Sequence, residues 1–154
     1  MREEVSILTT DVLLNEPLSL KLPKLKAKEL ERRGVKGLAY LEFDIMLGPK
    51  LRYYYYSERA SFIPKLVNNP AISVELSIIG KYAKEIVTDD GERLMIYKIS
   101  EKEEDGRTYP HFLILELRGN RKRNVKKLVE AVIHKTNGKI KNVNELKKAL
   151  VNSL

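Results

Sequence analysis

The side chains that most often carry catalysis are few in this sequence. It has no cysteine and only two histidines, His111 and His134, which stand apart rather than at metal-ligand spacing. No serine lies in a Gly-x-Ser-x-Gly turn. The run Gly48–Lys50 lacks the glycine spacing of a phosphate-binding loop, and Asp89–Glu92 lacks the spacing of a calcium loop. We therefore predict that the protein is not an enzyme, with no catalytic, metal-binding or cofactor-binding residue and no cofactor.

Positive charge is the strongest chemical feature of the chain. It carries 29 basic and 21 acidic residues, a net charge of +8, but residues 118–154 alone hold 11 basic and 2 acidic residues. Basic side chains could neutralise the phosphates of a nucleic acid, and the tyrosines at 53–56 could offer stacking surfaces beside Arg52. The candidate nucleic-acid-binding residues are Arg118, Arg121, Lys122, Arg123, Lys126 and Lys127. The alternative is a solvated helix face in a lysine-rich thermophilic protein.

Length and composition restrict the class of protein. A chain of 154 residues with 43% apolar residues fits one folded domain with a real core. No apolar run approaches the roughly 20 residues that span a bilayer. The charged start at residues 1–4 argues against a signal peptide, and the absence of cysteine fits a reducing compartment. We expect a cytoplasmic protein from a thermophile.

The first half of the chain predicts a β-hairpin behind an N-terminal extension. Residues 1–34 form that extension: 3–14 reads as a strand or a short helix, and 25–33 as a helix ending at Gly34. Residues 35–154 form the single main domain. Its first strand covers 35–47, turns at Gly48-Pro49 and returns over 50–56.

The second half predicts a long helix, a further strand pair and two C-terminal helices. An irregular or helical link broken at Pro64 leads to a helix over 70–87, capped by Asn69 and containing Gly80. Strands follow over 94–100 and 108–117, joined by a charged loop. The 94–99 run is apolar on both faces, as at a sheet edge covered by a second layer or chain. An apolar stripe from Val125 to Ile133 and a capping box at Asn142 and Glu145 mark the last two helices. We expect these residues in the core: Phe43, Ile45, Leu76, Ile79, Leu128 and Val132.

The stretch from Phe43 to Leu51, with its Gly-Pro turn, resembles the opening hairpin of longin-like domains. The order of hairpin, long helix, strands and C-terminal helices is similar to theirs and to the related roadblock and profilin-like folds. The resemblance covers residues 35–154 and would suit an archaeal member. It implies an α+β fold: an antiparallel sheet of about five strands, the long helix after the first hairpin, and C-terminal helices. The break at Pro64 and the basic C-terminal helix depart from the standard pattern.

The same resemblance implies a non-catalytic regulatory or scaffolding module. Such domains bind small GTPases, traffic factors or copies of themselves, through a sheet edge and the helix beside it. We therefore expect a protein partner of this kind and a homodimer. The candidate partner-binding residues are Gly80, Lys81, Lys84 and Tyr97. The alternative function is a nucleic-acid-associated protein that acts through the basic C-terminal helix.

Overall fold

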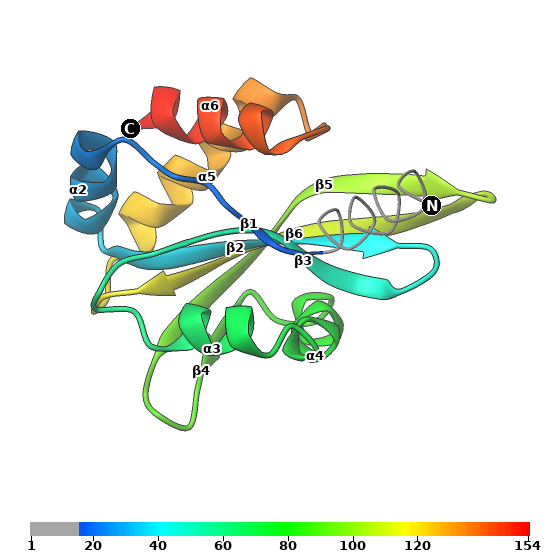
Figure 1. The fold of residues 1–154 in the computed structure, drawn as a ribbon, viewed down its shortest axis with the longest axis horizontal. Coiled ribbons are helices and arrows are strands. Elements are labelled where there is room, and N and C mark those ends of the chain that lie inside the picture. The colour runs from blue at the N-terminus through cyan, green and yellow to red at the C-terminus, as the bar shows by residue number, and fades with distance from the viewer. Residues whose placement is uncertain (1–15) are drawn as a thin grey trace, which may run out of the picture.

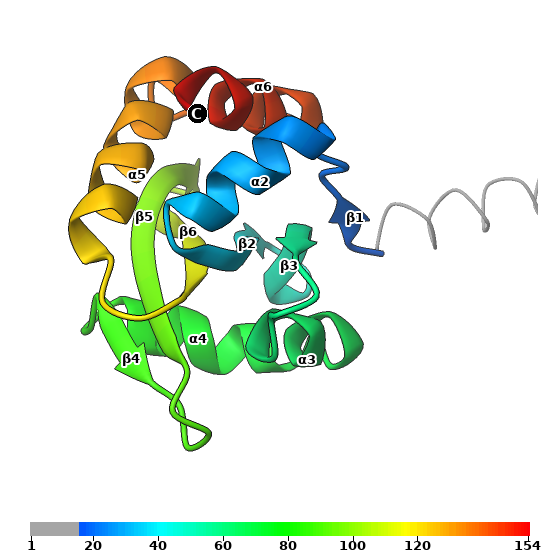
Figure 2. The ribbon, with the colours of Figure 1, turned by 90° about the vertical axis from the view of Figure 1, so that its left-hand side faces the viewer.

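A computed structural model describes residues 16–154 as one mixed sheet between two layers of helices (Figure 1). The strands are β1 (Leu18–Ser19), β2 (Val35–Asp44), β3 (Gly48–Tyr56), β4 (Glu85–Val87), β5 (Arg93–Glu104) and β6 (Arg107–Leu117). The helices are α2 (Lys24–Arg32), α3 (Phe62–Asn68), α4 (Ile72–Gly80), α5 (Lys122–Thr136) and α6 (Val143–Ser153). Helices α2, α5 and α6 cover one face of the sheet, and α3 and α4 cover the other (Figures 1 and 2).

The sheet has the order β1-β3-β2-β6-β5-β4. All neighbouring strands are antiparallel except β1, which pairs with β3 in parallel through Leu18 and Tyr53. The α+β class predicted from the sequence is confirmed, whereas the expectation of an antiparallel sheet of about five strands is wrong. The sixth strand is the two-residue β1, which is too short for alternation of apolar and polar residues to reveal it.

Both faces of the central strands are buried because each face has its own helical layer. Leu38 and Tyr40 of β2 enter the core under α2, α5 and α6, while Ala39 and Leu41 enter the core over α3 and α4. Strand β5 is covered in the same way, so its apolar 94–99 run needs no second chain. This double burial explains why these strands have long apolar runs.

The helix expected over 70–87 is about half that long. Helix α4 ends at Gly80, and the residues predicted as its last turn form β4 instead. Asn69 closes α3 rather than capping α4. A Cβ atom on Gly80 would lie 2.9 Å from Ile96 Cγ2 and 3.1 Å from Phe112 Cε1, so the missing side chain lets α4 approach the sheet. Pro64 does not break the link: it lies in the first turn of α3, where its absent N–H is not needed.

Two of the predicted core residues are exposed. Leu76, Leu128 and Val132 are at most 4% exposed, as predicted, but Ile45 is 46% and Ile79 is 37% exposed. Ile45 lies beyond the end of β2, in the turn that leads to β3. Asp44 stabilises this turn, because the Asp44 Oδ1 atom accepts hydrogen bonds from the backbone N–H groups of residues 46 and 47. Phe43 is half-buried.

The charged loop predicted over 101–107 is a tight hairpin. Strands β5 and β6 continue to Glu104 and Arg107, and Asp105 and Gly106 form the turn with φ values of 50° and 76°. Two consecutive positive φ values are typical of the two-residue turn that an Asp-Gly pair favours.

The prediction of two C-terminal helices is confirmed by α5 and α6. Asn142 Oδ1 accepts a hydrogen bond from the Glu145 backbone N–H, and the Glu145 carboxylate accepts one from the Lys141 N–H. Helix α2 also ends beside Gly34 as predicted. The possible strand or helix over 3–14 lies outside the described residues, and the boundary at residue 34 stays a prediction.

Candidate interaction surface

An apolar groove lies between α4 and the ends of two hairpins. Its volume is about 280 Å³, and we call it the α4 groove. Its lining includes Phe43, Pro49, Val74, Ile78, Lys81 and Tyr109. The rings of Phe43 and Tyr109 stack with their centroids 3.9 Å apart, which joins the β2–β3 hairpin to β6. Val74 and Ile78, one helical turn apart, present 42% and 54% of their surface to solvent.

Large exposed apolar side chains also lie in chain segments next to the residues that line the α4 groove. Met46 and Leu47, in the turn between β2 and β3, are 87% and 62% exposed. Tyr82, directly after the lysine that lines the groove, is 87% exposed. The two backbone hydrogen bonds of Asp44 hold the chain that carries Met46 in one conformation, and they lower the pKa of Asp44. Neighbouring apolar groups of this kind often mark a binding site for another protein.

The structure separates the four predicted partner-binding residues. Lys81 lines the α4 groove, and Gly80 sets how closely α4 approaches the sheet. Lys84 is exposed at the start of the short edge strand, where its carbonyl accepts a hydrogen bond from Ile96 N–H. Tyr97 packs against the core on the opposite face of the sheet. The groove residues Val74 and Ile78 were missed, because the spacing alone does not say which apolar residues of a helix stay exposed.

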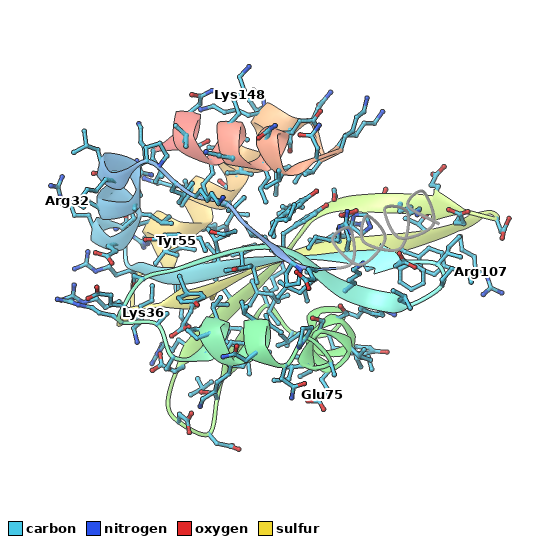
Figure 3. All side chains as sticks on the ribbon, in the orientation of Figure 1. Arg32, Lys36, Tyr55, Glu75, Arg107 and Lys148 are labelled. Carbon is cyan, nitrogen blue, oxygen red and sulfur yellow. The ribbon has the colours of Figure 1, made fainter. Side chains whose placement is uncertain are left out.

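Positive charge gathers on the opposite layer. Residues 20–33 and 118–154, which contain α2, α5 and α6, hold 17 basic and 4 acidic residues, whereas the remainder of the chain holds 12 basic and 17 acidic residues. We call this layer the basic face. Figure 3 shows Arg32 on α2 and Lys148 on α6 pointing outward from it, with Glu75 on the other side of the molecule.

Two of the six predicted nucleic-acid-binding residues have structural contacts. Arg121 donates a hydrogen bond of 2.6 Å to the Arg32 carbonyl, which ties α5 to α2. Lys122 forms an ion pair of 2.6 Å with Glu85 of β4. Arg118, Arg123, Lys126 and Lys127 are exposed. Among the tyrosines of β3, Tyr53 is 4% exposed in the core, and Tyr54 stacks on Tyr56, which is 42% exposed.

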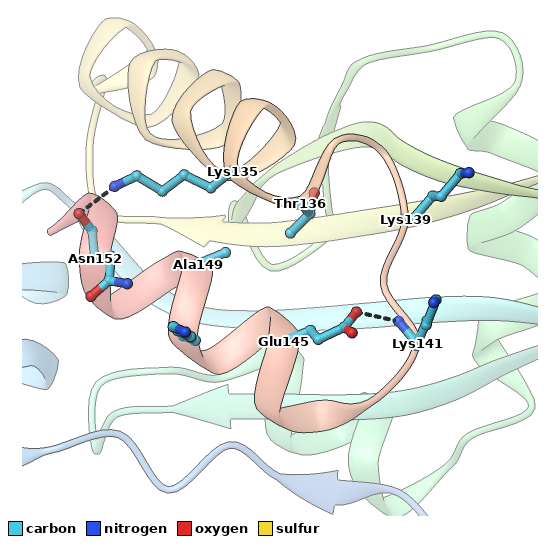
Figure 4. A pocket seen from close by; sticks show the side chains of 8 residues that line it. Lys135, Thr136, Lys139, Lys141, Glu145, Ala149 and Asn152 are labelled. Carbon is cyan, nitrogen blue, oxygen red and sulfur yellow. Dashed lines mark hydrogen bonds between the residues drawn. The ribbon is translucent and has the colours of Figure 1, made fainter.

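A pocket of about 640 Å³ lies between α5 and α6 on the basic face (Figure 4). Four lysines line it: Lys135, Lys139, Lys141 and Lys148. Glu145 also lines the pocket, where its carboxylate is turned toward the Lys141 backbone N–H. Lys135 donates a hydrogen bond to the Asn152 carbonyl at the other end. With four lysines and one glutamate in its lining, the pocket carries net positive charge, whereas Lys81 is the one charged residue among the described residues that line the α4 groove.

The buried polar groups of the sheet stabilise the fold. The Tyr40 hydroxyl, Ser100 Oγ and His111 Nδ1 lie within 2.9–3.2 Å of one another. Burial lowers the pKa of His111 to about 4 and raises that of Tyr40. Ser100 and His111 are each 6% exposed, which leaves little of either side chain for a substrate to reach. On the other face, the buried Glu116 carboxylate accepts hydrogen bonds from three backbone N–H groups, those of residues 61–63, at the start of α3.

Within residues 16–154, no helix is long and apolar enough to cross a membrane. The same part of the chain contains no group of three or more potential metal ligands. Comparison with protein-family models, curated proteins and solved structures finds no match to this chain.

Proposed function

We propose that this protein is a non-catalytic protein-interaction module and that two copies associate through the α4 groove. The observation that carries the proposal is the exposed apolar surface that α4 and the two hairpins form around the groove. Burial of apolar area is the main driving force for association, and exposed large apolar groups on one patch supply that area.

A second copy fits this surface because the patch has both a hollow and projecting side chains. A two-fold interface places the same patch on both partners, so each must supply what the other receives. The α4 groove is the hollow, and Met46 and Tyr82, each 87% exposed, are the side chains that could fill it. The longin-like resemblance also implies binding of a small GTPase; in that case the GTPase, rather than a second copy of the chain, would occupy the α4 groove.

Analytical ultracentrifugation over micromolar concentrations tests the proposal. We expect a reversible dimer, and we expect Ile78→Asp to weaken association by about tenfold or more, because it places a carboxylate in the desolvated centre. Tyr82→Ala, at a side chain that is 87% exposed, repeats the test with little risk to folding.

The matched control is Val87→Asp, which places the same charge at a 59% exposed valine on the edge strand β4. It should leave the dimer intact. A wild-type protein that stays monomeric throughout the concentration range, or a dimer that the groove variants leave unchanged, would contradict the proposal.

A further inference from the structure

We propose that the basic face binds the phosphate backbone of duplex nucleic acid, independently of the α4 groove. The two surfaces lie on opposite sides of the sheet, so both can be occupied at once (Figures 1 and 2). From the sequence, the candidate phosphate contacts lie at residues 118–127, within the basic segment 118–154. The structure adds α2, α6 and the lysine-lined pocket to the same surface.

The distribution of ion pairs distinguishes this face from an ordinary thermophilic surface. Such surfaces intersperse both signs and form ion-pair networks. In residues 34–117, at least six of the eleven cations have a carboxylate partner within 4.0 Å, as in Lys36–Glu92 at 2.8 Å and Lys98–Glu101 at 3.0 Å. On the basic face 17 cations share 4 acidic residues. Within the described chain, four of its exposed lysines have no carboxylate within 4.0 Å: Lys126, Lys127, Lys139 and Lys148.

The dimensions of the face match a run of phosphates. Helix α5 has 15 residues, which corresponds to a length of about 22 Å at 1.5 Å per residue. Duplex DNA presents one phosphate per about 1.7 Å of its axis when both strands are counted, so the helix is as long as a duplex segment that carries roughly a dozen phosphates. Twelve of the 17 cations are lysines, which act as point charges toward phosphate. Binding is therefore salt-dependent and independent of base sequence.

An anionic membrane is the other large polyanion that such a face could meet. A helix that lies on a membrane buries its apolar side in the lipid. The apolar sides of helices α5 and α6 are already buried inside the protein, since Leu128, Val132 and Leu146 are at most 1% exposed. Leu25 on α2 is exposed on this layer, but it is a single residue. The geometry therefore favours nucleic acid.

Fluorescence anisotropy with a labelled 20-base-pair DNA duplex of mixed sequence tests this assignment in the full chain. We expect an affinity in the non-specific range, on the order of 10⁻⁴–10⁻⁶ M at physiological salt, that falls linearly with salt on logarithmic axes. The test variant combines four exposed positions: Lys126→Ala, Lys127→Ala, Lys139→Ala and Lys148→Ala. Each phosphate contact that it removes should reduce the salt slope by about 0.9. We expect binding at low salt to weaken at least tenfold.

A control variant removes the same charge from other parts of the surface: Arg59→Ala, Lys65→Ala, Lys84→Ala and Arg107→Ala. It should keep the salt slope of the wild-type protein. Equal loss in the two variants would show that net charge alone attracts the duplex and would overturn the assignment. So would the absence of duplex binding at low salt, or binding by the basic face to phosphatidylserine vesicles in preference to the duplex. Thermal unfolding followed by circular dichroism verifies that both variants fold.

Discussion

His111 should make the protein less stable as the pH falls below neutrality. Its pKa is about 4 in the folded protein, because burial disfavours the charged ring and, to a smaller extent, Lys102 repels it. In the unfolded chain the pKa returns to the ordinary value of 6.5. Between these two values the unfolded chain binds more protons than the folded one, so lowering the pH favours unfolding.

The size of this effect follows from the difference between the two pKa values. One pKa unit corresponds to about 1.4 kcal/mol, so the full loss is about 3 kcal/mol, of which roughly 2.5 kcal/mol is reached at pH 4.5. Above pH 6.5 the neutral His111 ring costs the folded protein no stability, and below pH 4 protonation of His111 causes no further loss of stability.

Urea unfolding at pH 7.5 and pH 4.5, for the wild-type protein and for His111→Phe, measures this contribution. The variant keeps the hydrogen bond of 2.9 Å between the hydroxyls of Tyr40 and Ser100 and removes the titrating ring. Carboxylates such as Asp44 also change charge with pH, but they do so in both proteins and cancel in the comparison. The wild-type protein should lose about 2–3 kcal/mol more than the variant. Equal losses in the two proteins would refute the account of the buried ring.

Three further predictions concern the layer that carries the α4 groove, and urea unfolding of each variant measures them. Glu116→Ala should cost about 3 kcal/mol or more, because three N–H groups at the start of α3 lose their acceptor; a loss below about 0.5 kcal/mol would mean that water replaces the carboxylate. Leu76→Ala should cost ~2–5 kcal/mol as a core truncation, and a near-neutral result would place this residue at the surface. Gly80→Ala should destabilise by about 1–3 kcal/mol despite the better helix propensity of alanine, and a gain in stability would contradict the close approach of α4 to the sheet.

Elements with strong local signals were predictable from the sequence. The stripe of α5, the cap of α6 and the β2–β3 hairpin each depend on residues that are close together in the chain. The predicted position of the hairpin turn is wrong, however: the turn covers residues 45–47, and Gly48 and Pro49 already belong to β3, where they pair with Asp44 and Phe43. The Asp105-Gly106 turn carried an equally local signal, but the surrounding charged residues led to a loop prediction. Charged side chains are compatible with a strand whose faces extend beyond the helical layers, as at the end of β5.

The features that the sequence could not provide depend on contacts between distant segments. Helix α4 packs closely on Ile96 and Phe112 at Gly80, and no local pattern predicts that contact. The α4 groove arises where two hairpins and a helix meet, so its members are far apart in the sequence. The basic face likewise forms only when α2 packs beside α5, where Arg121 reaches the Arg32 carbonyl.

The most direct test of the central claim measures the distance between two copies of the chain. Since the sequence has no cysteine, a single spin label can be placed at Glu75→Cys, beside the α4 groove, or at Lys148→Cys, on the basic face (Figure 3). Pulsed electron–electron double resonance then reports the distance between labels. We predict a short, narrow distribution for the Glu75 site and a longer distance for the Lys148 site. A shorter distance at Lys148 than at Glu75, or no dipolar coupling between copies at either site, would contradict association through the α4 groove.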